Sequence, residues 1–253
     1  MWFIGWILGV LIWAFPVQAE NALLVAAASD LQFALSEIAQ NFTQETGKQV
    51  KLSFGSSGNF QRQIKEGGPF EIYFSADEEY VLDLAKQGFT KDQGVLYAEG
   101  RIVLFVPTGS LLKPDASFKD LAEKIEQAKL KKFAIANPQH APYGRAAKEA
   151  LITANLWDKL RPNLVMGENI SQAAQYATTT SGGIIAYSLA LSPKISGLGQ
   201  YALIPATSHK PLRQRMVLTN KAGKLAQEFY NYLQLPQTRS ILKKYGFTLP
   251  GEE

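Results

Sequence analysis

The chain has 253 residues, of which 46% are apolar and 19% are charged, so it can bury one large core or two smaller ones. Its formal net charge of +4 comes from lysines and arginines scattered along the sequence, so charge does not indicate a nucleic-acid-binding protein. Cysteine is absent, which excludes disulfide bonds, thiolate catalysis and cysteine-ligated zinc.

The first segment predicts export. Residues 2–15 (WFIGWILGVLIWAF) carry no charge and are followed by Pro16-Val17-Gln18-Ala19. A short apolar run before small residues is typical of a secretory signal peptide, here residues 1–19 with cleavage after Ala19. An uncleaved membrane anchor is the alternative, because no Lys or Arg precedes the run. The run is shorter than the ~20 residues of a membrane span, which favours cleavage. We expect the rest of the chain to be translocated and soluble.

Strand and helix patterns alternate after Glu20. The expected strands are residues 23–28, 50–54, 70–75, 101–106, 133–136, 183–187, 201–205 and 216–219. The expected helices are residues 31–46, 60–65, 78–87, 143–155, 170–177, 225–233 and 237–244. This alternation predicts an α/β fold with mainly parallel sheets. The units are too many for one sheet and lack the regularity of a barrel, so we expect two lobes with ligands at the carboxyl ends of strands.

Two junctions between strand and helix in the first third of the chain carry hydroxyl groups. In residues 26–32 (AAASDLQ), Ser29 and Gln32 have the spacing of a capping box, which predicts that Ser29 begins the helix. In residues 54–58 (FGSSG), small residues allow the backbone to approach a ligand, and Ser57 offers a hydroxyl at the helix start.

Two further junctions follow in the middle of the chain. In residues 137–144 (NPQHAPYG), Pro142 suits the first helical turn and Tyr143 follows it. In residues 167–172 (GENISQ), Asn169 has a glutamine three residues on, which is again capping-box spacing. Helix starts present unpaired N–H groups and the positive end of the helix dipole, so four of them together could hold a tetrahedral oxyanion without any Lys or Arg.

Seven stretches spread along the chain match one known family. They are AAASDL (26–31), FGSSGNFQRQI (54–64), IYFSAD (72–77), NPQHAPYGRAAKEAL (137–151), GENISQA (167–173), GGIIAYS (182–188) and KKYGF (243–247). With these stretches the chain resembles the periplasmic molybdate-binding proteins of bacterial molybdate ABC transporters over nearly its whole length after the first segment.

The resemblance implies a two-lobed periplasmic binding protein fold of type II, in which each lobe is a mixed, mainly parallel sheet flanked by helices. Lobe 1 is expected over residues 20–100 and 214–253, and lobe 2 over residues 101–213. The resemblance implies a periplasmic, monomeric, non-enzymatic protein that captures molybdate and tungstate. Its partners would be the membrane permease and the ATPase of an ABC transporter, and no cofactor or nucleic acid is expected.

The resemblance also assigns the oxyanion ligands. Ser29 and Ser57 would each give hydroxyl and backbone donors. Asp30 would give its backbone N–H with its carboxylate pointing away, and Tyr143 and Ile170 would each give a backbone N–H.

The sequence leaves two candidates for the residue that makes the last contact to the oxyanion. Some family members add a tyrosine from a strand, but the matching position here is Ala186, with Tyr187 next to it. Tyr187 and the phenol of Tyr143 are the two candidates.

Other readings of the sequence are weaker. Sulfate and phosphate are alternative oxyanions, and the family match rather than the donor chemistry selects molybdate. A secreted serine hydrolase would use Ser57 with His140 or His209 as its base, but the G-x-S-x-G spacing is not met. Two histidines without cysteine predict no site for a bare metal cation.

Overall fold

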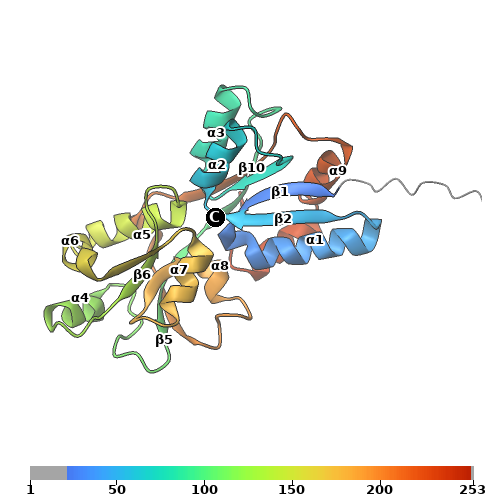
Figure 1. Ribbon diagram of the computed structural model, residues 1–253. Helices are drawn as coiled ribbons and strands as arrows, with labels where there is room; N and C mark the ends of the chain where they lie inside the picture. Colours follow the sequence, from blue (N-terminus) through green and yellow to red (C-terminus); the bar gives the residue numbers. More distant parts are fainter. Residues whose placement is uncertain (1–21, 252–253) are drawn as a thin grey trace, which may run out of the picture.

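The computed structural model describes residues 22–251, so the predicted signal peptide lies outside the described part of the chain. Two five-stranded sheets, each flanked by helices, form two bodies that meet near the centre of the molecule (Figure 1). Within residues 22–251, no helix combines the length and the apolar character needed to cross a membrane.

The first sheet has the strand order β2-β1-β3-β10-β4. Its strands are β1 (Leu23–Ala28), β2 (Val50–Gly55), β3 (Ile72–Ser75), β4 (Val95–Gly100) and β10 (Leu212–Leu218). β1 pairs in parallel with β2 and β3, while β10 runs antiparallel to β3 and β4.

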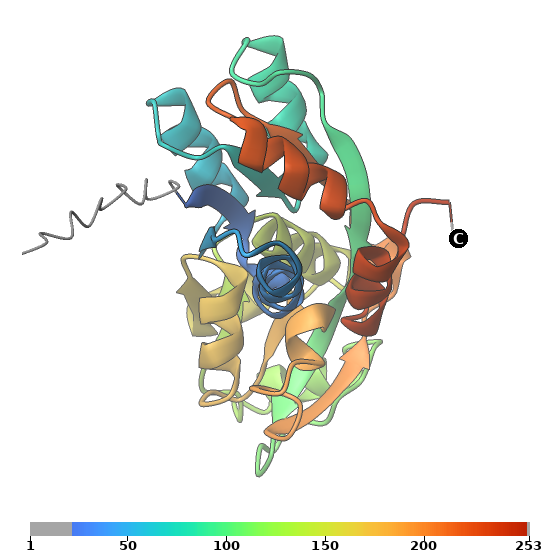
Figure 2. The same ribbon diagram turned by 90° about the vertical axis from the view of Figure 1, so that its right-hand side faces the viewer.

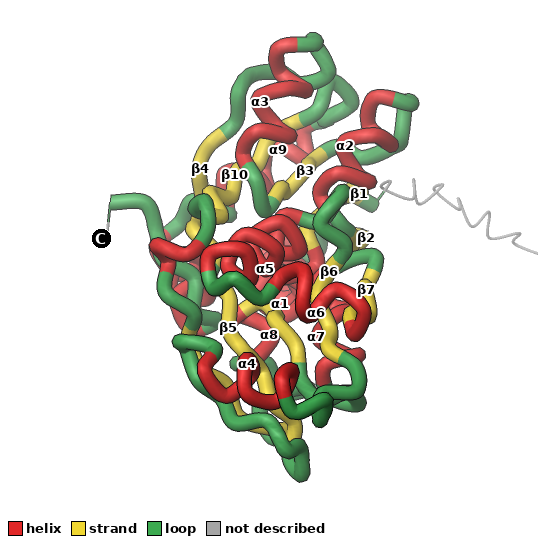
Figure 3. Tube along the Cα trace, turned by 90° about the vertical axis from the view of Figure 1, so that its left-hand side faces the viewer, coloured by secondary structure: helices red, strands yellow, loops and turns green. Residues whose placement is uncertain are grey.

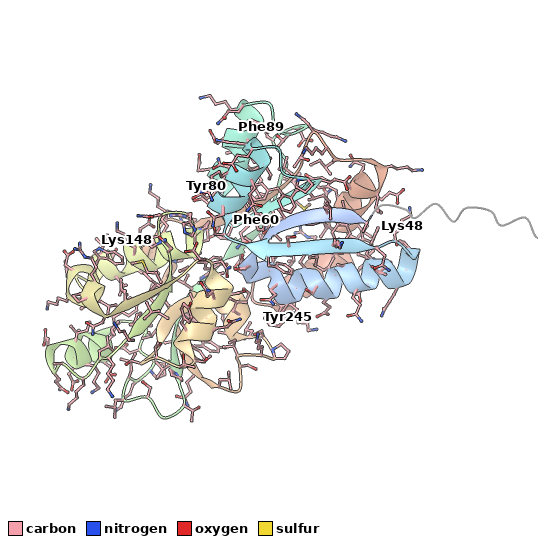
Figure 4. The ribbon with its side chains drawn as sticks, in the orientation of Figure 1. Lys48, Phe60, Tyr80, Phe89, Lys148 and Tyr245 are labelled. Atoms are coloured by element: carbon pink, nitrogen blue, oxygen red, sulfur yellow. The ribbon has the colours of Figure 1, made fainter. Side chains whose placement is uncertain are left out.

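Alternate residues of β1 enter cores on opposite faces of this sheet, as the pleat of a strand requires. Val25 and Ala27 pack with the apolar sides of α1 (Gln32–Thr46), α9 (Lys224–Tyr232) and α10 (Pro236–Lys244). Ala26 packs with α2 (Ser57–Lys65) and α3 (Glu78–Lys86). The C-terminal helices are the red ones in Figure 2, and Figure 4 labels Phe60, the aromatic residue of α2 in the second core.

The second sheet has the strand order β7-β6-β8-β5-β9. Its strands are β5 (Ile102–Pro107), β6 (Phe133–Ala136), β7 (Leu164–Gly167), β8 (Gly183–Ala186) and β9 (Gly199–Leu203). β6 pairs in parallel with β7 and β8, while β5 runs antiparallel to β8 and β9. Both sheets are therefore mixed, as expected, with an antiparallel part in each.

Five helices belong to this second body, and Figure 3 shows them around its strands. They are α4 (Lys119–Glu126), α5 (Pro142–Thr153), α6 (Trp157–Leu160), α7 (Ile170–Ala177) and α8 (Tyr187–Ala190). Short 3-10 turns complete the fold at η1 (Ser29–Leu31), η2 (Arg161–Asn163) and η3 (Ala206–Ser208).

The chain crosses between the two sheets at two places. β4 ends at Gly100 and β5 begins at Ile102, so a single residue, Arg101, makes the first crossing. β9 ends at Leu203 and β10 begins at Leu212, so residues 204–211 make the second crossing. The expected lobe boundaries, 100/101 and 213/214, stay a proposal that is consistent with these crossings.

Candidate oxyanion-binding site

Four strand ends meet where the two bodies touch. The carboxyl ends of β1 and β2 arrive from the first sheet, and those of β6 and β7 arrive from the second, because residues that follow these strands line one cavity. They surround a small cavity lined by Ala28, Ser29, Asp30, Gly55, Ser56, Ser57, Ala76, Ala141, Pro142, Tyr143 and Ile170. The lining contains no Lys or Arg, and it includes five of the six residues that the sequence predicted as ligands.

Ser29 is placed differently from the capping-box expectation. Ser29 begins the 3-10 turn η1, and the N-cap of α1 is Leu31, without a side-chain hydrogen bond. The Ser29 hydroxyl instead crosses to α7, where it donates to Asn169 Oδ1 at 3.1 Å and accepts from the N–H of Ser171 at 3.1 Å. The capping prediction was wrong, because the Ser29 hydroxyl bonds to residues of the second body and not to the first turn of its own helix.

Ser57 is the first residue of α2 and is fully buried. Its hydroxyl accepts a 3.0 Å hydrogen bond from the N–H of Ala76, and its carbonyl accepts a 2.8 Å bond from the phenol of Tyr73. These two bonds hold Ser57 in one orientation. A hydroxyl that accepts from Ala76 keeps its own proton for another acceptor, which suits a ligand donor.

Tyr143 and Ile170 both stand at helix starts, as predicted. Pro142 is the first residue of α5 and Tyr143 the second. Ile170 is the first residue of α7, and the N-cap Asn169 accepts a 3.0 Å bond from the N–H of Gln172. The Asn169 cap prediction is thereby confirmed. An N–H in the first turn of a helix has no acceptor within the helix, so both residues offer backbone donors to the cavity.

The carboxyl group of Asp30 lies in a buried polar chain. Its Oδ2 accepts a 2.9 Å bond from the phenol of Tyr143 and a 2.7 Å bond from the amide of Gln214. Gln214 in turn accepts from the phenol of Tyr97. Burial raises the pKa of Asp30 to about 6, although the bonds from Gln214 and Tyr143 act against that rise.

This polar chain settles where the phenol of Tyr143 points. Burial, followed by the neighbouring Asp30, raises the pKa of Tyr143 well above its ordinary value, so the phenol remains a donor. A Cβ at Gly100 would lie 2.3 Å from the Tyr143 hydroxyl oxygen, so the phenol needs a glycine beside it. The O–H of Tyr143 is therefore directed to Asp30.

Tyr187 does not line the cavity. It begins α8, and its ring packs edge-on against Tyr201 with centroids 5.5 Å apart. A Cβ at Gly246 would lie 2.6 Å from the same ring. The hydroxyl of the next residue, Ser188, donates a 2.9 Å bond to the backbone carbonyl oxygen of Asp30.

His140 faces a different serine from the one considered as a nucleophile. Its Nδ1 lies 3.0 Å from the hydroxyl oxygen of Ser56, and its Nε2 lies 3.4 Å from a carboxylate oxygen of the exposed Glu168. His209 has its Nδ1 against the carbonyl oxygen of Lys210. In the described part of the chain, no cluster of three His, Cys, Asp or Glu side chains could hold a metal ion.

Direct contacts join the two bodies around the cavity. The N–H of Gly58 donates to the carbonyl oxygen of His140 at 2.9 Å. An ion pair joins Arg145 of α5 to Asp77 at the start of α3, with 3.3 Å between the charged atoms. Sequence reasoning singled out none of these pairings, because each partner is unremarkable until the fold brings the two together.

The chain is similar to known solute-binding proteins over most of its length. A family model described as "Bacterial extracellular solute-binding protein" matches residues 23–248. The molybdate-binding protein ModA of Rhodobacter capsulatus is 32% identical over 92% of this chain and 90% of its own length. The ModA of Azotobacter vinelandii is 33% identical over 96% of this chain and 95% of its own length.

A solved structure agrees with these matches. The periplasmic molybdate-binding protein of Azotobacter vinelandii superposes with a TM-score of 0.81 at 29% identity, covering 90% of this chain and 99% of that one. The similarity therefore extends over most of the chain, including strands of both sheets.

Proposed function

Because the chain belongs to the bacterial extracellular solute-binding proteins, in the family of the molybdate-binding proteins ModA, we propose that it captures molybdate in the cavity between its two sheets. The observation that carries the proposal is the cavity itself, to which both sheets contribute the first turns of helices while no Lys or Arg lines it. Such turns bind an anion through N–H groups and helix dipoles.

The proposed ligands follow from the lining. Ser57 would contribute hydroxyl and backbone donors. Ser29 would contribute its backbone N–H, and its hydroxyl would turn from Asn169 to the anion. Asp30, Tyr143 and Ile170 would contribute backbone N–H groups. All five line the one cavity. Tyr187 is not part of this proposed site.

The N–H and O–H donors of the lining also limit the kind of anion. Molybdate and tungstate carry no proton at neutral pH, so donors can satisfy all of their oxygens. The two anions have the same charge and almost the same size, so we propose that both bind. Sulfate is smaller than molybdate, and the family match rather than the donor chemistry favours molybdate over phosphate.

We further propose that the protein works outside the cytoplasm, as the predicted signal peptide and the family imply. It would deliver its anion to the membrane permease of an ABC transporter with its ATPase. The two lobes would close around the anion by bending at the crossings, Arg101 and residues 204–211, so that the protein changes from an open to a closed form.

Calorimetric titration with molybdate, tungstate, sulfate and phosphate in turn tests the proposal. We expect saturable binding of molybdate and tungstate, with no heat from sulfate or phosphate at the same concentrations. A thermal shift that follows mass action should accompany binding. Stabilisation by sulfate or phosphate without any by millimolar molybdate would overturn it.

Hydrolysis is tested in the same preparation. The family consists of binding proteins, so we expect no turnover of a model ester. Any turnover that is found should be compared in Ser56→Ala and Ser57→Ala, because Ser56 is the serine in contact with a histidine.

A further inference from the structure

One oxygen of a buried carboxyl group beside the cavity has no hydrogen-bond partner. Asp30 is 1% exposed and lines the cavity, and its Oδ2 accepts from both Tyr143 and Gln214. Its Oδ1 is buried and, within residues 22–251, has no hydrogen-bond partner of normal geometry, although the backbone N–H groups of Asp30 and Leu31 are close enough to act against the rise in the pKa of the carboxyl group. A buried polar atom without a partner is costly, so its position next to a ligand cavity requires an explanation.

No positive charge compensates this carboxyl group. The side chains that reach it are neutral, namely the phenol of Tyr143 from α5 and the amide of Gln214 from β10, with the phenol of Tyr97 from β4 behind. From α8, Ser188 reaches only the Asp30 backbone carbonyl. From the start of α7, the neutral Asn169 and Ser171 face Ser29. Across residues 22–251, no Lys, Arg or His forms an ion pair with Asp30.

An ionised carboxylate at this position conflicts with the proposed ligand. A dianionic oxyanion in the cavity would lie beside the negative charge of the Asp30 carboxylate. Like charges repel each other strongly in a buried environment, where solvent screens them weakly. A neutral carboxylic acid removes the repulsion. It also converts Oδ1 from an unpaired acceptor into an O–H donor, which is what an oxyanion requires.

Building on the function proposed above, we propose that the site binds one proton together with each oxyanion, and that the proton resides on Asp30 Oδ1. The proton comes from solvent, a new O–H bond forms on the carboxyl group, and no electron changes hands. The O–H then donates to the bound oxyanion. Asp30 is therefore a binding residue through its side chain as well as its backbone, in contrast to the family expectation of a carboxylate pointing away.

The acidity of the group fits this assignment. Burial already places the pKa of Asp30 at about 6, so the carboxyl group is largely ionised at pH 7.5 and is ready to accept a proton when the dianion arrives. The dianion raises that pKa further. Between the two pKa values, molybdate affinity should fall about tenfold for each unit of rising pH.

Molybdate titrations in buffers of different ionisation enthalpy test the proposal, because the buffer supplies the proton and adds its heat. Wild-type protein should take up close to one proton per molybdate at pH 7.5, and its affinity should fall from pH 7 to pH 9. Asp30→Asn resembles the protonated acid, so it should bind molybdate without proton uptake and with a nearly flat pH profile. If the asparagine variant does not fold, Asp30→Ser provides the same comparison.

Two further variants identify the residue that accepts the proton. His140 contacts the lining residue Ser56, and an imidazole is the other kind of side chain there that could bind a proton, so His140→Gln should retain proton uptake if Asp30 is the acceptor. Asp158→Asn, on the exposed side of α6, is the matched aspartate control and should behave as wild type.

The outcomes separate the two proposals. Molybdate binding without proton uptake by the wild type, or with equal uptake by Asp30→Asn, overturns the role of Asp30 and leaves the proposed function intact. If molybdate gives no binding heat at any pH, the proposed function fails and the proton site falls with it.

Discussion

The backbone N–H of Gly58 lies 2.9 Å from the backbone carbonyl oxygen of His140, and this hydrogen bond joins the first turn of α2 to the loop that precedes α5. The contact is so close that a Cβ on Gly58 would lie 2.8 Å from the same oxygen. The two bodies can approach to this distance only because residue 58 has no side chain.

Gly58→Ala should therefore weaken molybdate binding without unfolding the protein. The added methyl group meets backbone atoms of the opposite body, which cannot move aside as a flexible side chain would, so the closed arrangement is disfavoured. We expect a loss of about 1–3 kcal/mol, as for overpacked positions, by calorimetric titration. Gly197→Ala is the control, because a Cβ there meets nothing within 4 Å. Equal affinities of Gly58→Ala and wild type would contradict the closing role of this contact.

Ser29→Ala and Ser57→Ala should each weaken molybdate binding by roughly 1–3 kcal/mol, because a buried anion loses a donor. Each hydroxyl also bonds within the protein, so the melting temperature without molybdate must be measured beside the affinity. Ser36→Ala is the matched control, since that exposed hydroxyl bonds only within α1. Unchanged affinity in both site variants would remove the two serines from the site.

The ion pair between Arg145 and Asp77 should contribute weakly to closure. Both side chains are partly exposed, so solvent screens the attraction, and Asp77→Asn should cost about 1 kcal/mol of molybdate affinity or less. Asparagine can still cap α3, where Asp77 accepts from the N–H of Glu79. The effect should shrink as salt is added. Glu126→Gln, in a remote ion pair with Lys159, should leave the affinity unchanged. A salt-independent loss for Asp77→Asn would point to a structural effect instead.

Tyr187→Phe should bind molybdate as tightly as wild type, because the ring of Tyr187 packs against Tyr201 outside the cavity. The substitution keeps the ring and removes only the hydroxyl. A loss of affinity beyond experimental error in calorimetric titration would restore Tyr187 to the list of ligands.

Asp30→Asn should stabilise the protein without molybdate at neutral pH. Burial raises the pKa of Asp30 from an ordinary 3.8 to about 6, so the native state binds more protons than the unfolded state between these values. That contribution is fully present below pH 3.8 and is lost as pH rises through 6. The unfolding free energy of wild type relative to Asp30→Asn should therefore fall by up to about 3 kcal/mol between pH 4 and pH 7 in denaturant titrations. A pH-independent difference would mean that Asp30 does not titrate as described.

The sequence predicted the elements whose hydrophobic pattern is strong. β1, β6 and α7 have the expected bounds, and Asn169 caps α7 as its spacing indicated. β4 was not predicted, because its Tyr97-Ala98-Glu99-Gly100 segment lacks a clear apolar alternation and forms a strand only through pairing with β10. β7, which is short and partly exposed, was missed for the same reason.

The site was predictable in part for a related reason. Helix starts are encoded locally, so Ser57, Tyr143 and Ile170 could be located from spacing and resemblance. The partner of a polar group is not encoded locally, so the bond from Ser29 to α7 replaced the predicted capping box. The same limit hid Gln214, which lies 184 residues from Asp30 in the chain and reaches it only through the packing of β10.

The lining without lysine or arginine has a consequence for the water in which the protein operates. Dissolved ions screen a lysine that attracts an anion, but they have little access to buried N–H and O–H groups. A rise in salt concentration should therefore leave the affinity of the proposed site for its oxyanion almost unchanged. The protein would bind the anion about equally tightly at high and at low salt, and salt would change only the rate of association.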